Sequence, residues 1–158
     1  MSELALGLRL GSGKEAEVFA CGAGVVKLYR PTAPKHSPFR EAAILAVVEA
    51  LGLPAPVVLG VQRFGDRWGV LMSRVEGPTF AEAMADDAKA VPGYLNRLAH
   101  LHLHVHGHSG TRFASLKERL ATNIHAAPLL CEQRRDALLA DLATMSDHDR
   151  LCHGDFHP

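Results

Sequence analysis

The sequence has no excess of charge of either sign. Its 158 residues contain 17 Lys and Arg against 17 Asp and Glu, and the pI is about 7.2. Proteins that bind the phosphate backbone of nucleic acids usually show a clustered basic excess and a high pI. The balanced charge therefore argues against a nucleic-acid partner.

Cysteine is scarce, and no long apolar run is present. Cys21, Cys131 and Cys152 are far apart and fit no C-x-x-C spacing, which excludes a disulfide framework and a thiolate zinc site. The richest apolar segment, residues 42–53, is too short to span a bilayer and contains a glutamate. The first seven residues lack the basic region of a secretion signal. We therefore expect a soluble, cytoplasmic protein with no membrane partner.

The first half of the chain has the pattern of a small sheet. Short β-rich segments separated by glycines predict strands at 8–10, 17–19 and 25–29. Gly65-Asp66 predicts a hairpin between two further strands at 57–64 and 67–75. Together these segments indicate an antiparallel sheet.

One helix is predicted between the third and fourth strands. Ser37 and Pro38 suit an N-cap and the first helical position, and Gly52 suits the stop after a helix that runs to about Leu51. The residues of its predicted apolar face are Ile44, Leu45, Val48 and Leu51.

After Gly77-Pro78 the pattern becomes helical. Thr79 with Glu82, and later Ser115 with Glu118, have the spacing of a capping box. Helices are predicted at about 79–86, 92–107, 115–126 and 131–144. The change predicts an α+β chain with two lobes, residues 1–76 and residues 77–158.

Gly11, Ser12 and Gly13 form a glycine-rich turn between two predicted strands. The turn fails the Walker A pattern, because residue 8 is Leu and Glu15 follows Lys14. It also fails the dinucleotide fingerprint, because a strand rather than a helix follows. Two interpretations stay open: a hairpin lid over nucleotide phosphates, G-x-G-x-x-G-x-V with Ala16 at the third glycine, and a tight hairpin without a ligand.

Lys27 lies inside an apolar predicted strand, where its charge is costly unless it finds a partner or an exposed face. Glu41 falls near the middle of the predicted apolar stripe of the helix. An ion pair between them would hold the ammonium against nucleotide phosphates. The alternatives are a solvated lysine and a first-turn glutamate favoured by the helix dipole.

The segment Cys152-His153-Gly154-Asp155-Phe156-His157-Pro158 places a carboxylate after a predicted strand. Such a carboxylate can accept a hydroxyl proton in phosphoryl transfer, where the catalyst mainly orients groups and neutralises charge. The order of the four features, a glycine turn, Lys27, Glu41 and then Asp155, is more specific than any one of them.

With these motifs the sequence resembles the aminoglycoside phosphotransferase and choline kinase-like family, which has a protein-kinase-like fold. The resemblance is carried by segments 11–19, 25–30, 40–45, 70–77 and 152–158. It implies a small antiparallel N-terminal lobe with one helix, which binds nucleotide, and an incomplete helical C-terminal lobe that ends in the catalytic loop. It also implies transfer of the γ-phosphate of ATP to a hydroxyl of a small molecule.

The resemblance assigns a role to each matched residue. Gly11, Ser12 and Gly13 would cover the ATP phosphates, and Lys27 would contact them while paired with Glu41. The backbone of Met72, Ser73, Arg74 and Val75 would hold the adenine. Asp155 would be the catalytic carboxylate, with His153 of the same motif beside it. The resemblance does not specify the acceptor.

The sequence departs from the family pattern in its metal ligands. The family has an Asn two residues after the His-Pro pair and a later strand-borne Asp, which hold Mg²⁺, and neither lies within the 158 residues. We therefore expect an N-terminal portion of a phosphotransferase with little or no activity alone. The alternative is a catalytically silent nucleotide-binding or interaction module.

Five histidines alternate along residues 100–108. On a helix, His100, His104 and His108 form one i,i+4 column and His102 and His106 another, which would suit Zn²⁺ or Ni²⁺. The family resemblance instead matches His102 and His106 to a Leu-His repeat on a helix. No carboxylate or thiol completes a site, so we predict no metal ligands here.

Overall fold

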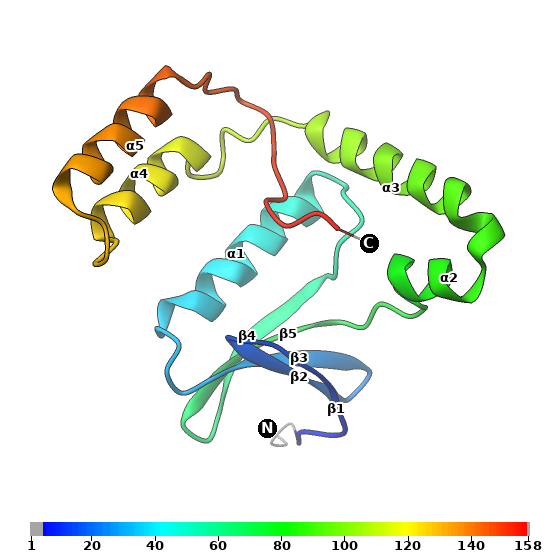
Figure 1. The fold of residues 1–158 in the computed structure, drawn as a ribbon. Helices are drawn as coiled ribbons and strands as arrows, with labels where there is room; N and C mark the ends of the chain where they lie inside the picture. The colour runs from blue at the N-terminus through cyan, green and yellow to red at the C-terminus, as the bar shows by residue number, and fades with distance from the viewer. Residues whose placement is uncertain (1–4, 158) are drawn as a thin grey trace. The chain divides into compact units, whose positions relative to one another are not determined.

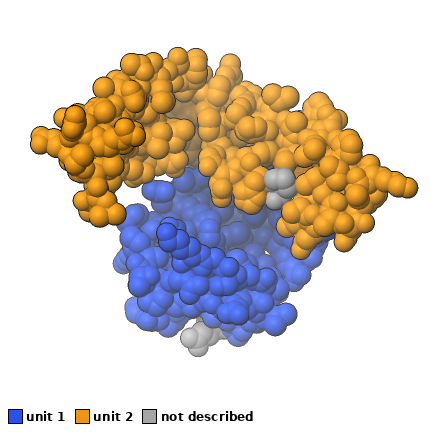
Figure 2. Space-filling view, viewed as in Figure 1, with its two compact units in different colours: residues 1–78 blue, residues 79–158 orange. Residues whose placement is uncertain are grey.

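The computed structural model describes residues 5–157. Residues 1–4 lie outside the described residues, and so does Pro158, the last residue of the terminal motif. The chain divides into two compact units, Met1–Pro78 and Thr79–Pro158, which Figure 2 shows in different colours. Within the described residues, no helix is long and apolar enough to cross a membrane.

The first unit is a five-stranded sheet with one helix (Figure 1). All neighbouring strands are antiparallel, and their spatial order is β1-β2-β3-β5-β4. The predicted sheet and its five strands are confirmed. The strands are β1 Arg9–Ser12, β2 Ala16–Cys21, β3 Gly24–Tyr29, β4 Val58–Phe64 and β5 Arg67–Ser73.

Strand β3 lies at the centre of the sheet between β2 and β5. Its residues are buried on both faces, except for the half-buried Lys27. Val26 of β3 and Val70 of β5 are fully buried. A strand covered on both faces reads as a nearly continuous apolar run, which explains why Lys27 stands out in the sequence.

The hairpin between β4 and β5 forms at the predicted turn. Phe64 pairs with Arg67, and Gly65 has φ of +60°. Glycine adopts this left-handed conformation without the steric strain of a Cβ, so the Gly65-Asp66 signal correctly located the turn.

Helix α1, His36–Ala50, packs against β4 and β5. Its predicted start is wrong by two residues: Lys35 is the N-cap, without a side-chain cap bond, and Ser37 lies inside the helix. Pro38 is tolerated because the first helical N–H groups have no intrahelical acceptor. The predicted end is confirmed, because the Gly52 N–H bonds to Glu49 and its φ is +71°.

The buried face of α1 also differs from the prediction. Pro38 and Ala42 are buried and Leu45 packs on the core, whereas Ile44 is 38% exposed. Glu41 therefore lies at the edge of the buried face, and not in its middle.

The second unit is helical, as predicted. A short 3₁₀ turn at Ala88–Ala90 precedes α3, and α4 and α5 contact each other. The four predicted helices are confirmed to within about a residue at each end. The helices are α2 Phe80–Asp86, α3 Val91–His106, α4 Leu116–Ala126 and α5 Glu132–Thr144.

Both predicted helix starts have side-chain caps. Thr79 and Glu82 form a complete capping box at α2. Ser115 accepts hydrogen bonds from the N–H groups of Lys117 and Glu118 at α4, and only this half of the second box forms within the described residues. Lys117 also donates to the carbonyls of Ala143 and Met145 at the end of α5, which ties the two helices together.

The central position of Val70 gives a stability prediction. Val70→Ala should lower the free energy of unfolding by about 2 kcal/mol, because it removes two methyl groups from a closed core and leaves a cavity. Leu59→Ala is the control, because Leu59 of β4 is 65% exposed. Urea unfolding of both variants measures the difference, and equal losses would contradict this position of the core.

Candidate functional site

Lys27 and Glu41 meet between β3 and α1. The ammonium of Lys27 lies 2.8 Å from Oε1 of Glu41, and their side chains are 36% and 25% exposed. The strand gives Lys27 the same face as Val25 and Tyr29, and that face looks toward α1. The ion pair expected from the sequence is therefore present, and neither residue is a freely solvated surface charge.

Tyr29 joins this pair, although the sequence prediction does not include it. Its phenol donates a hydrogen bond to Oε2 of Glu41, and the ammonium of Lys27 lies 5.6 Å from the centre of its ring. Both carboxylate oxygens of Glu41 are thus engaged, one by a charge and one by a hydroxyl. The two-residue spacing from Lys27 was the available signal, because residues i and i+2 of a strand share a face.

The protonation of Tyr29 is stabilised by its surroundings. Burial, and then the hydrogen bond and negative charge of Glu41, raise the pKa of the phenol well above its ordinary value of 10.0. The phenol stays a donor at neutral pH, and the carboxylate of Glu41 stays oriented toward Lys27.

The glycine turn connects β1 and β2. Gly11 pairs with Val18 and Ser12 with Glu17, and the N–H of Gly13 closes the turn by donating to the carbonyl of Ala16 at 2.8 Å. The turn residues are exposed. The turn therefore continues the hairpin, as the lid interpretation and the plain hairpin interpretation both require.

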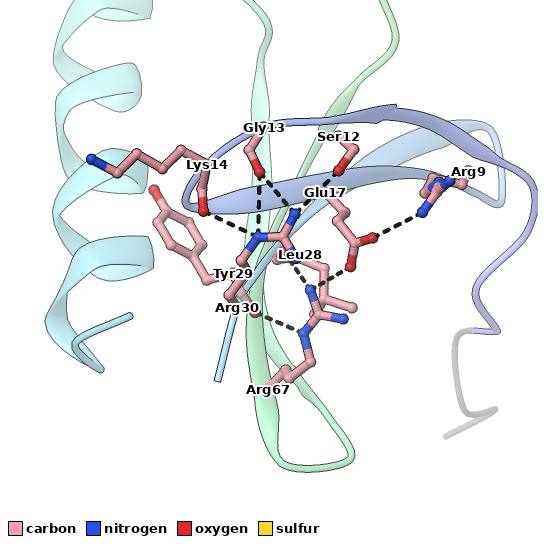
Figure 3. Close-up of polar contacts among 9 residues, drawn as sticks. All are labelled: Arg9, Ser12, Gly13, Lys14, Glu17, Leu28, Tyr29, Arg30 and Arg67. Atoms are coloured by element: carbon pink, nitrogen blue, oxygen red, sulfur yellow. Dashed lines mark hydrogen bonds and ion pairs between the residues drawn. The ribbon is translucent and has the colours of Figure 1, made fainter. Parts of the chain in front are cut away.

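Two arginines that the sequence prediction does not include fix this part of the sheet (Figure 3). The guanidinium of Arg30, directly after β3, donates to the carbonyls of Gly13 and Lys14. Arg67 of β5 donates to the carbonyls of Leu28 and Tyr29 and pairs with Glu17. This pairing lowers the pKa of the Glu17 carboxyl. Arg30 thus holds the turn, and Arg67 holds the end of β3.

A pocket of about 570 Å³ lies between the turn, β3 and α1. Its lining includes the cations Lys14, Lys27 and Arg40 and the acids Glu15 and Glu41. Lys27 and Glu41 neutralise each other, and the remaining charges of the lining are the cations Lys14 and Arg40 against the acid Glu15. Such a pocket suits a polyanion with several phosphate groups.

The segment proposed for adenine binding follows the end of β5. Met72 is buried in the sheet, and Ser73 donates its N–H to the carbonyl of Val57. Arg74 forms an ion pair with Glu76, and Val75 is 72% exposed. Within residues 5–157, the backbone groups of Arg74 and Val75 have no hydrogen-bond partner. The backbone of these two residues is the part of the predicted segment that can still bind a ligand.

The terminal motif belongs to the second unit. Asp155 is exposed, and its carboxylate lies 3.9 Å from Nε2 of His157. Phe156 stacks on the ring of His102 of α3 at 4.6 Å, and His153 meets Phe156 edge-on at 5.7 Å. The predicted catalytic residues His153 and Asp155 therefore lie on a loop that Phe156 anchors to α3.

Two pairs of the predicted histidine columns have their rings in contact. The rings of His102 and His106 are 4.1 Å apart, and those of His104 and His108 are 5.1 Å apart. Among residues 5–157, no group of three or more His, Cys, Asp or Glu side chains is arranged to hold a metal ion. The metal-binding hypothesis gains no support, and the stacking on Phe156 gives His102 a packing role.

The comparisons with known proteins agree with this fold. The sequence model of the phosphotransferase enzyme family matches residues 7–158. A solved structure, the crystal structure of an aminoglycoside-3'-phosphotransferase of type VIII, is similar with a TM-score of 0.53 and 21% identity. The likeness covers 97% of this chain and 63% of that one, so this chain spans less than two thirds of that relative. The protein-kinase-like α+β fold class is confirmed. No curated protein matches the chain.

The hydrogen bond from Tyr29 to Glu41 gives a prediction for stability and for its pH dependence. Tyr29→Phe should lower the free energy of unfolding by about 1 kcal/mol at neutral pH, because one carboxylate oxygen loses its donor. The folded phenol has the higher pKa, so its contribution is complete below pH 10.0 and is lost as the pH rises above that value. The difference between the wild type and Tyr29→Phe should therefore shrink in alkali.

Urea unfolding at neutral and alkaline pH measures this difference, with Tyr94→Phe as the control. Tyr94 lies edge-on against Phe80 in the second unit and contacts no carboxylate within the described residues. An equal and pH-independent loss in both variants would show that the contact with Glu41 contributes nothing.

Proposed function

The chain belongs to the phosphotransferase enzyme family, and from that premise we propose that its first unit binds the phosphates of ATP. The observation that carries this proposal is the contact of Lys27 with Glu41 at 2.8 Å beside a pocket with a cationic lining. An ammonium that is held by a carboxylate keeps a fixed position and still offers two N–H groups to phosphate oxygens.

The glycine turn supports the same proposal. Neither Gly11 nor Gly13 has a positive φ, so the conformation of the turn does not itself require glycine. A Cβ built on Gly11 would meet nothing within 4 Å. Glycine at such a position leaves the backbone open to close approach by a ligand, which is its use in phosphate-binding loops. The backbone of Gly11, Ser12 and Gly13 would thus cover the phosphates.

We assign the adenine to the backbone after β5. Of the predicted residues Met72, Ser73, Arg74 and Val75, the last two have backbone groups without a partner within the described part of the chain. Exposed donors and acceptors at the end of a strand suit the edge of a purine ring. The first unit then supplies all contacts to the nucleotide that the proposal needs.

For the reaction, we assign Asp155 as the group that orients the acceptor hydroxyl of a small molecule and accepts its proton. The bond from the γ-phosphorus to the bridging oxygen of ATP would break as the bond to the acceptor oxygen forms. His153 would assist Asp155 from the same loop. Phe156 supports this role, because its stacking on His102 fixes the loop that carries Asp155.

The described residues do not fit a magnesium site. No group of three or more His, Cys, Asp or Glu side chains in residues 5–157 can hold a metal ion, and the exposed carboxylate of Asp155 is paired with His157. We propose instead that the 158 residues alone bind nucleotide but turn it over slowly, as a nucleotide-binding module.

Nucleotide binding is tested directly. Lys27→Met should weaken ATP binding by about tenfold or more, because it removes a charge-assisted phosphate contact. Glu41→Gln should weaken it less, because it frees the ammonium without removing it. Isothermal titration calorimetry with ATP measures both. Lys35→Met is the matched control, because Lys35 lies over the ring of Trp68 and does not line the pocket. Equal affinity in all four proteins would refute the site.

Turnover is tested separately. We expect ATP hydrolysis by the 158-residue chain with Mg²⁺ and a panel of hydroxyl acceptors to stay near the uncatalysed rate. Coupled ADP release measures it in the wild type, in Asp155→Asn and in the control Asp149→Asn. Kinase-like rates in the wild type would contradict the slow-turnover proposal. If Asp155→Asn then abolished them, the role of Asp155 would be supported.

A further inference from the structure

Arg30 makes more contacts with the glycine turn than any other described side chain. Its Nη2 donates to Oγ of Ser12 at 3.2 Å and to the carbonyl of Gly13 at 2.9 Å. Its Nε donates to the carbonyl of Lys14 at 3.0 Å. Its own backbone N–H donates to the carbonyl of Glu15 at 2.8 Å. Figure 3 shows the guanidinium beneath the turn, in contact with three successive residues.

These contacts give the turn an order that it lacks by itself. Residues 11–15 are exposed, and within the turn one backbone bond, from Gly13 to Ala16, closes it. An exposed glycine-rich turn loses much conformational entropy when it is fixed. A planar guanidinium offers donors in a rigid fork and can bridge several acceptors at once, which a lysine ammonium on its flexible stem does less well. Arg30 therefore selects one conformation of the turn.

The conformation held by Arg30 places Lys14 at the pocket. The carbonyl of Lys14 accepts a hydrogen bond from Arg30. The side chain of Lys14 extends toward α1, on the side of the Tyr29 hydroxyl (Figure 3). Lys14 lines the pocket together with Lys27, whereas Arg30 does not. Arg30 thus contacts the turn from outside the pocket lining, and Lys14 of the turn forms part of that lining. Any effect of Arg30 on a ligand in the pocket acts through the turn.

We propose that Arg30 is a positioning residue that locks residues 12–14 and presents Lys14 as a second phosphate-binding cation beside Lys27. This inference rests on the proposed nucleotide site and deepens it. Lys14 and Lys27 reach the pocket from different elements, the turn and β3, so they can contact different phosphate groups of one polyphosphate. The affinity for a nucleotide should then rise with its number of phosphates.

The affinities of ATP, ADP and adenosine for single and double variants test this inference by calorimetry. We expect Arg30→Gln and Lys14→Met each to weaken ATP binding by about three- to tenfold, with a smaller effect on ADP and none on adenosine. The double variant should bind ATP no more weakly than Lys14→Met, because Arg30 acts through Lys14. Arg9→Gln is the matched control, since Arg9 pairs with Glu17 and does not contact the turn.

Arg30→Lys separates positioning from simple attraction. It keeps the positive charge but loses the fork that binds Gly13 and Lys14, so we expect it to weaken ATP binding about as much as Arg30→Gln. Full ATP affinity in Arg30→Lys would overturn the positioning role. Additive losses in the double variant, or a loss for adenosine equal to that for ATP, would overturn it as well. A thermal melt of each variant identifies losses caused by unfolding.

The outcomes distinguish this inference from the proposed function. If Lys27→Met weakens ATP binding and Arg30→Gln does not, the nucleotide site stands and the role of Arg30 is refuted. If the wild-type chain does not bind ATP, both are refuted. If Lys14→Met binds ATP as the wild type does, Arg30 has no second cation to present and the inference fails.

Discussion

The contact between Lys27 and Glu41 is the interaction on which the first unit depends. A lysine on the central strand of a sheet is costly to bury, and Val25 and Tyr29, which share its face, are buried. Glu41 offsets this cost only if α1 lies over the same face of the sheet at the right rotation and height. The ion pair therefore constrains the register of β3, the direction of α1 and the depth of the pocket together. Tyr29 reinforces the constraint, because it engages the second oxygen of the carboxylate.

Strand β3 connects this ion pair to the glycine turn. Lys27, Tyr29 and Arg30 lie within four residues of one another. Lys27 and Tyr29 both contact Glu41, and Arg30 contacts the turn. Arg67 holds the carbonyls of Leu28 and Tyr29 and keeps the end of this strand against β2. A central strand is the most rigidly placed element of a small sheet, because it is bonded on both sides. Locating the polar groups on it gives them a common reference, which a loop would not provide.

The elements were predictable from the sequence because their signals are local. Glycines bound the strands, Gly65-Asp66 turns the hairpin, and Thr79 with Glu82 starts a helix within four residues. Lys27 and Glu41 were predictable as a pair because each is a charge where the pattern calls for an apolar residue. The start of α1 was not, because Lys35 caps it without a side-chain bond and so leaves no cap signature.

The supporting residues were not predictable for a different reason. In the sequence, Tyr29 and Arg30 have the pattern of an ordinary strand end, and no local pattern indicates that their side chains form hydrogen bonds. Their partners lie 12 and 17 residues away, on a helix and on a turn. The prediction for Ile44 was wrong for the opposite reason, because its apolar side chain at helical spacing assigned it to the core. Packing of Ala42 and Leu45 on the sheet decided the rotation of α1 and left Ile44 exposed at the pocket.

The histidines of α3 show how a repeated residue acquires separate roles from its neighbours. Two histidine pairs have their rings in contact, but a metal site needs a third ligand, and the described residues provide none. His102 instead presents a flat ring to Phe156, and a stacked pair at 4.6 Å fixes the loop by contact area and not by charge. The backbone carbonyl of His108 accepts a hydrogen bond from the N–H of Leu151, which anchors the same loop at its other end. His102 of α3 and His108, two residues after the end of α3, therefore hold the segment around Asp155 at two points and leave the carboxylate itself exposed between them.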